Sequence, residues 1–117
     1  MGERKACGRS MNLAEAVREL PYDEFIVRLI DAERDLEHRI IQRLTRLYRG
    51  NVEDEMKLAK EIANLESALN LAIKTRLQLE AARRVGPNTY RVVAELLQPS
   101  LARIDTALKE HPLLVEA

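Results

Sequence analysis

Four arginines without an intervening acid form the strongest charge feature of the sequence. They are Arg39, Arg43, Arg46 and Arg49, and the first three follow an i, i+4, i+7 spacing that places them along one side of a helix. Guanidinium groups in such a strip can bind acidic lipid headgroups, nucleic acid or the acidic patch of a neighbouring subunit. The alternative is a solvated face, on which Arg46 and Arg49 complement the helix C-terminus and pair with acids across the next turn.

Few other residues could support chemistry. Glu33 and Glu37 share a helix face, but His38 lies about 100° away from Glu37, so the Glu-x-x-His pattern of di-metal bundles is absent. The sequence has no Gly-rich phosphate loop, no Cys–His pair and no nucleophile motif. One Cys and two His disfavour a zinc site and exclude an internal disulfide. We therefore predict a non-enzymatic protein with no catalytic residue, metal site or cofactor.

The arginines lie in a predicted helix over residues 22–49. Its apolar residues recur at spacings of three, four or seven: Leu29, Leu36, Ile40, Leu44 and Leu47. Gly50 and Asn51 end this helix, and Asn51 is positioned to cap the next one, predicted over 52–85. A break of two residues between long helices predicts a tight antiparallel hairpin.

The predicted helix over 52–85 carries two apolar stripes, although the hairpin needs only one. The main stripe comprises Leu58, Ile62, Leu65, Leu69, Ala72 and Ile73, and the second comprises Ala68, Leu71, Leu79 and Ala82. A further helix or another copy of the protein must cover the second stripe. We predict that it packs against the following helical region in a closed state and against another subunit in an assembled state, which makes it the predicted self-association site.

Shorter elements flank the predicted hairpin. A helix over 13–20 begins with a weakened capping box at Asn12 and Glu15, and Pro21 interrupts it. A helical region over 88–110 contains Pro99, which should kink or divide it. The predicted organisation is a flexible basic arm (1–10), a single all-α helical-bundle domain (11–110) and a tail (111–117) whose proline and three apolar residues are unusual for a bare terminus.

The composition narrows the class of protein. The 117 residues have a formal net charge of zero, which argues against a general nucleic-acid coat. Apolar residues make up 46% of the chain and charged residues 32%, with no long apolar run, so a disordered or membrane-spanning chain is not expected. Aromatic residues make up only 3%, and an aliphatic core suits helix-on-helix packing. These features predict a soluble cytoplasmic protein.

Three segments give the predicted hairpin a family resemblance. They are 59–66 (AKEIANLE), 77–86 (LQLEAARRVG) and 94–99 (AELLQP). Together with the hairpin they resemble the core of the ESCRT-III family, in particular its archaeal cell-division (CdvB-type) branch, over about residues 32–108. The chain departs from the family pattern because it is neutral, has no acidic run after Glu110 and has no clear tail motif for an MIT domain.

The resemblance implies a filament-forming protein that remodels membrane during cell division or budding, located in the cytoplasm and peripheral at the membrane. Its implied partners are further copies of itself, an acidic membrane surface and an AAA ATPase with an MIT domain; nucleic acid is a less favoured partner. Two other interpretations stay open. One is a small helical adaptor or subunit of a larger complex, such as a replication or RNA-processing complex. The other is a nucleic-acid-binding bundle that uses the Arg39–Arg49 strip.

Overall fold

The computed structural model describes residues 11–50 and 53–115, and this part of the chain is helical throughout apart from short connections and the end of the chain. Its helices are α2 (Leu13–Glu19), α3 (Tyr22–Arg49), α4 (Glu55–Val85), α5 (Pro87–Leu96) and α6 (Gln98–Glu110). The described residues contain no strand, so the predicted all-α class is confirmed. The predicted basic arm over 1–10 lies outside the described residues.

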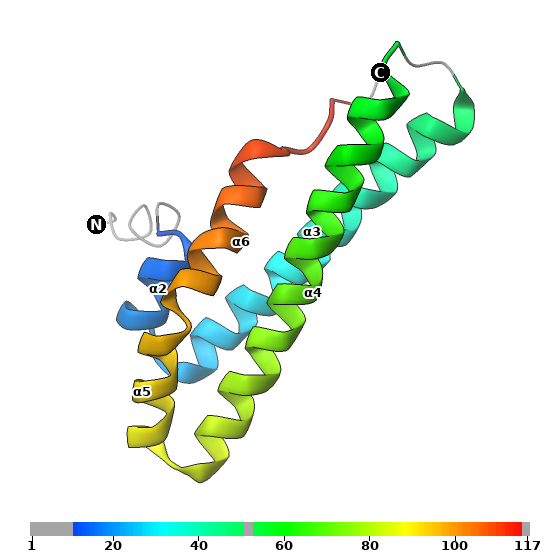
Figure 1. Ribbon diagram of the computed structural model, residues 1–117. Helices are drawn as coiled ribbons and strands as arrows, with labels where there is room; N and C mark the ends of the chain where they lie inside the picture. Colours follow the sequence, from blue (N-terminus) through cyan, green and yellow to red (C-terminus); the bar gives the residue numbers. More distant parts are fainter. Residues whose placement is uncertain (1–10, 51–52, 116–117) are drawn as a thin grey trace.

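Helices α3 and α4 form the predicted long antiparallel hairpin (Figure 1). Gly50 ends α3 with a left-handed backbone (φ 68°), and its N–H donates to the carbonyl oxygen of Leu47. The predicted two-residue turn is wrong, because α4 begins at Glu55 rather than at 52. Asp54 caps α4 by accepting the backbone N–H of Lys57 at 3.0 Å. The cap predicted at Asn51 lies outside the described residues.

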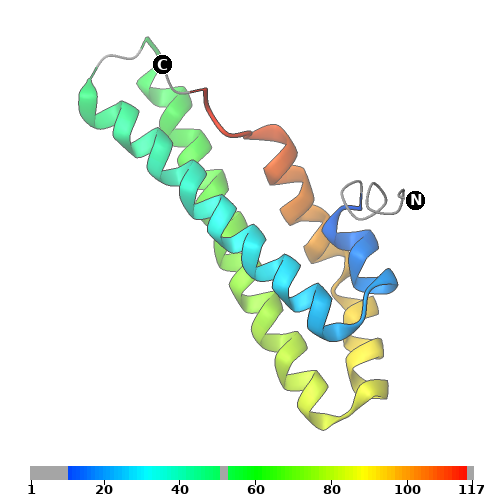
Figure 2. The same cartoon turned by 180° about the vertical axis from the view of Figure 1, so that it is seen from behind.

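The shorter helices α2, α5 and α6 cover one side of the hairpin (Figures 1 and 2). Helix α4 packs against α3, α5 and α6, and α2 lies between α3 and α6. Pro99 divides the predicted region over 88–110, because α5 ends at Leu96 and the proline occupies the first turn of α6. The missing N–H of a proline removes no intrahelical hydrogen bond at that position.

Aliphatic side chains from all five helices meet in one core. The largest fully buried ones are Leu29, Leu36, Leu65, Leu79, Leu101 and Ile104, joined by Phe25, and the alanines Ala16 and Ala72 are fully buried as well. Thr75 of α4 is also buried, and its hydroxyl has no hydrogen-bond partner among the described residues. Such an unpaired buried hydroxyl costs about 1–3 kcal/mol of stability. The aliphatic core holds the hairpin and the shorter helices in one bundle.

Asp105 of α6 fixes the start of α2. Its carboxylate accepts the backbone N–H groups of Leu13 at 2.8 Å and Ala14 at 3.0 Å. The predicted capping box at Asn12 and Glu15 is present as well, with hydrogen bonds of 2.9 and 3.2 Å. The first turn of α2 is therefore held both by its own sequence and by a residue more than ninety positions later.

Replacing Asp105 with alanine should lower the free energy of unfolding by about 1–2 kcal/mol, because two helix N–H groups lose their acceptor. Burial raises the pKa of Asp105, and the nearby Glu15 raises it further, against the two backbone hydrogen bonds and Arg28. The pH-dependent part of the Asp105 contribution to stability is therefore complete below the ordinary aspartate pKa of about 3.9 and is lost as pH rises through the raised pKa, whereas an ionised Asp105 still accepts the two N–H groups.

The pH dependence can be isolated with Asp105→Asn, which does not titrate. Urea unfolding of both chains between pH 3 and pH 7 should show that the wild type loses stability relative to this variant as pH rises through the raised pKa. A difference that stays constant over that interval would contradict the assigned pKa direction.

Candidate interaction surfaces

Arg39, Arg43 and Arg46 lie along one side of α3 as predicted, but this side faces the C-terminal end of the chain. We call residues 111–115, which follow α6 without regular secondary structure, the tail segment. The Arg39 guanidinium donates to the carbonyl oxygens of Leu108 and His111, the latter at 3.1 Å. The same guanidinium also forms a two-pronged ion pair with Asp35 at 2.8 and 3.0 Å. Arg39 therefore holds the end of α6 against α3.

Arg43 is buried, and its predicted place on an exposed strip is wrong. Its side chain is only 2% exposed, and Nε lies 2.8 Å from a carboxylate oxygen of Glu61 on α4. Its Nη2 donates to the carbonyl oxygen of Pro112 at 2.9 Å, and its Nη1 to that of Arg39 at 3.2 Å. A buried guanidinium is tolerated when its donors are paired, and here the pairing joins α3, α4 and the tail segment.

Gln42 and Arg46 also form hydrogen bonds with the tail segment. The Gln42 side-chain amide donates to the carbonyl oxygen of Leu114 at 3.1 Å and accepts its N–H at 2.9 Å. Arg46 donates to the carbonyl oxygen of Val115 at 3.1 Å. Arg49, the last residue of the predicted strip, is exposed. The role of Gln42 was not predicted from the sequence. The apolar character of the tail was the only indication that this segment packs against the bundle.

The second apolar stripe of α4 is largely part of the core. Ala68 and Leu79 belong to the same buried cluster as Leu101 and Ile104 of α6. Ala82 is buried too, and Leu71 is partly buried against this cluster. The stripe is therefore mostly buried in the core of this structure, in which α5 and α6 pack against α4. Contact of the stripe with another subunit stays a prediction.

A groove lies between α3 and α4 that the shorter helices and the tail segment leave uncovered. This hairpin groove has a volume of about 590 Å³, and its lining residues all come from α3 and α4: Glu37, Ile40, Ile41, Glu66, Leu69 and Asn70. Ile41 is 57% exposed, and Leu44 and Tyr48 follow it at i+3 and i+7 on the same face of α3. On α4, Leu69 is followed at steps of four by Ile73 and the exposed Leu77. The groove combines three aliphatic residues with one amide and with a carboxylate on each helix.

A second cavity lies at the junction of α2, α4 and α5, with a volume of about 540 Å³. Tyr22 and Tyr90 meet edge to face in its wall with ring centroids 5.2 Å apart, and the Arg83 guanidinium lies 5.4 Å from the Tyr22 ring centroid. Arg18 pairs with Glu95 at 3.2 Å on its rim. Burial raises the pKa of the Tyr90 phenol. These contacts join α2 to α5, α5 to α3, and α3 to α4.

The turn from α4 to α5, at the end of the molecule away from the hairpin turn (Figure 1), carries exposed arginines and aliphatic residues. We define the α4–α5 end by Arg84, Val85, Arg91 and Val92 near this turn, together with Leu96 at the far end of α5. Val85, Val92 and Leu96 are 75%, 59% and 72% exposed. Among the described residues, neither arginine has a carboxylate partner within ion-pair distance. In the sequence, Arg83, Arg84 and Arg91 already form a small basic cluster near this turn.

Glu33, Glu37 and His38, the residues considered for a metal site, have different surroundings in the structure. Glu33 pairs with Arg76 of α4 across the hairpin, and this hydrogen bond raises the pKa of Arg76. Glu37 and His38 are exposed. Within residues 11–50 and 53–115, no group of three or more metal-ligating side chains could hold an ion. No helix in that part of the chain is both long and apolar enough to span a bilayer.

Comparison with known proteins adds no family assignment. No protein-family model, no curated protein and no solved structure matches this chain. A functional hypothesis therefore depends on the surfaces of the molecule and on the motif resemblance within residues 59–99.

Proposed function

We propose that this chain is a non-enzymatic, self-assembling helical protein of the ESCRT-III kind that acts on an acidic membrane during cell division or budding. The observation that carries the proposal is the hairpin groove. One side of the hairpin is covered by α2, α5, α6 and the tail segment (Figure 2), whereas the groove on the hairpin is open and presents aliphatic side chains beside two carboxylates.

The exposed apolar and aromatic residues of the hairpin support assembly rather than a monomeric end state. Ile41, Leu77 and Tyr48 are 57%, 54% and 88% exposed, and they lie on the helices that form the groove. Single exposed apolar residues are common on monomers, but several that continue an apolar groove are typical of a protein interaction site. A second copy of the chain can cover them by helix-on-helix packing.

The membrane part of the proposal rests on the resemblance to ESCRT-III. The tail segment occupies the side of α3 that carries Arg39, Arg43 and Arg46, and of the four arginines in the predicted strip Arg49 is the one that is exposed. One basic residue near an acidic membrane contributes about 1 kcal/mol. Such a contact is weak for a monomer and adds up in a polymer with many copies. An AAA ATPase with an MIT domain is the proposed disassembly partner.

Sedimentation velocity over a range of protein concentrations tests self-assembly, and electron microscopy with acidic or neutral vesicles tests the membrane part. We expect concentration-dependent assembly, with filaments or coated tubes on acidic vesicles and weaker coating at high salt. A chain that stays monomeric at every concentration would contradict the proposal and favour the adaptor interpretation. Binding to nucleic acid but not to acidic vesicles would favour the nucleic-acid-binding interpretation.

A further inference from the structure

We infer that copies of this chain join head to tail, with the α4–α5 end of one copy seated in the hairpin groove of the next. The inference rests on the proposed self-assembly and names the two surfaces that form the contact. The partner is a second copy because the chain presents two complementary surfaces, an acidic apolar groove and a basic apolar end.

The groove supplies the negative half of the contact. Glu37 of α3 and Glu66 of α4 line it beside Ile41 and Leu69. Both glutamates are exposed, and within the described chain neither forms an ion pair. Two unpaired carboxylates beside an apolar floor favour an occupant that brings both aliphatic side chains and positive charge.

The α4–α5 end supplies the positive half. Arg84 and Val85 are neighbours at the end of α4, and Arg91 and Val92 are neighbours on α5. Leu96 lies one helical turn after Val92 on the same side of α5. The exposed arginines can reach the two glutamates while the aliphatic side chains enter the groove. Of the nearby carboxylates, Glu95 pairs with Arg18 and Glu80 pairs with Arg76, whereas Asp23 lines the same surface hollow as Arg84 without an ion pair among the described residues.

The two surfaces cannot meet within one molecule. Leu69 in the groove and Arg84 at the end lie fifteen residues apart on the continuous helix α4, which is about 22 Å at 1.5 Å per residue. Each copy therefore keeps one groove and one end free for different neighbours. A contact between two different surfaces is heterologous, and unless its rotation closes a ring it produces an open filament. A symmetric groove-to-groove pair would instead bring like charges together.

Charge reversal on each surface tests the contact. The first variant carries Glu37→Arg and Glu66→Arg, and the second carries Arg84→Glu and Arg91→Glu. Sedimentation velocity of each variant alone should show association at least about tenfold weaker than in the wild type. An equimolar mixture should assemble again, because each reversed surface then meets a surface of opposite charge. Far-UV circular dichroism verifies that both variants are folded.

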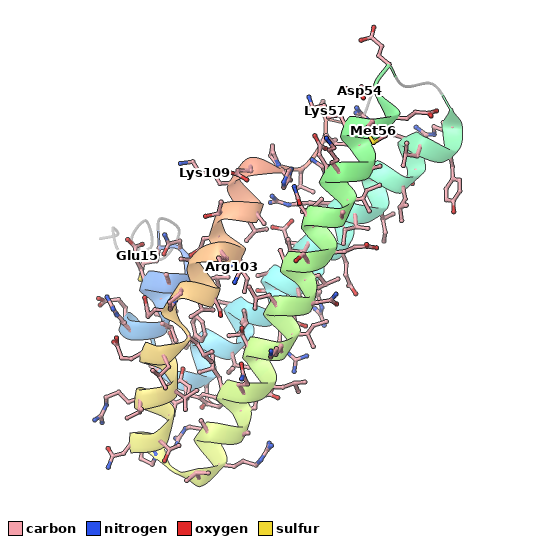
Figure 3. The ribbon with its side chains drawn as sticks, viewed as in Figure 1. Glu15, Asp54, Met56, Lys57, Arg103 and Lys109 are labelled. Atoms are coloured by element: carbon pink, nitrogen blue, oxygen red, sulfur yellow. The ribbon has the colours of Figure 1, made fainter. Side chains whose placement is uncertain are left out.

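Matched controls change the same charges elsewhere. Arg103→Glu with Lys109→Glu alters two exposed basic residues of α6, which lie away from the α4–α5 turn (Figure 3). Glu19→Arg with Glu110→Arg alters exposed acids at the ends of α2 and α6. Both controls should assemble like the wild type.

The outcomes separate this inference from the proposed function. If the variant with Arg84→Glu and Arg91→Glu assembles as strongly as the wild type, the head-to-tail contact is wrong, although self-assembly itself is not contradicted. A mixture that fails to assemble would overturn the contact too. If the variant with Arg84→Glu and Arg91→Glu assembles normally but no longer binds acidic vesicles, the α4–α5 end is a lipid-binding surface instead. A monomeric wild type would contradict the proposed function itself.

Discussion

Replacing Arg43 with alanine should lower the free energy of unfolding by about 3 kcal/mol, because it leaves a partly buried carboxylate without its partner. The Arg43 side chain is 2% exposed and that of Glu61 is 20% exposed. The substitution also removes the donor to the carbonyl oxygen of Pro112 and empties the space between α3, α4 and the tail segment. Chemical denaturation followed by circular dichroism measures the loss.

Two comparison variants show whether the ion pair itself is responsible. Arg43→Met combined with Glu61→Leu removes both charges and fills the space, so it should cost much less than Arg43→Ala. Arg49→Ala removes an exposed arginine from the same helix and should change stability by about 0.5 kcal/mol or less. A loss of less than about 1 kcal/mol for Arg43→Ala would mean that the pair behaves like a surface salt bridge.

This prediction changes how the arginine strip should be tested for lipid binding. Charge reversal at Arg39 or Arg43 disrupts contacts with Asp35, Glu61 or the tail segment, so a loss of vesicle binding could follow from a damaged fold. Arg49 makes no such contact within the described chain and is the cleaner position.

The helices could be predicted from sequence because their signals are local. The helix predicted over 22–49 has the bounds of α3, and Pro99 indicated the division between α5 and α6. The turn after Gly50 was predicted too short because two residues, Asn51 and Asp54, can each cap a helix. Propensity alone does not decide between such neighbouring caps, and the structure uses Asp54.

The surfaces were less predictable because they depend on distant residues. The spacing of Arg39, Arg43 and Arg46 correctly placed them on one side of a helix. Their partners in the tail segment lie 69 to 72 residues later, and no local pattern announces such contacts. The hairpin groove likewise requires the relative register of α3 and α4, which a single helix pattern does not contain. The covering of Ala68 and Leu79 was predictable because an apolar stripe must be buried by something.

Leu79→Ala should lower the free energy of unfolding by about 2–5 kcal/mol, which is typical of a leucine truncated in a closed core. Leu79 is 0% exposed and belongs to the cluster that includes Leu101 and Ile104. Leu77→Ala, two residues earlier on α4, should cost about 0.5 kcal/mol or less, since Leu77 is 54% exposed. Thermal and urea denaturation of the two variants measure this difference.

The same pair of leucines separates folding from assembly. Leu77 continues the α4 wall of the hairpin groove, so Leu77→Asp should weaken self-association while leaving the bundle folded. Leu79→Ala should instead destabilise the bundle and uncover the second stripe transiently. The side chains of the hairpin groove are unchanged in this variant, so self-association through the groove should persist. If Leu77→Asp assembles like the wild type while Leu79→Ala abolishes assembly at a temperature where it is folded, the second stripe is the self-association surface and the groove is not.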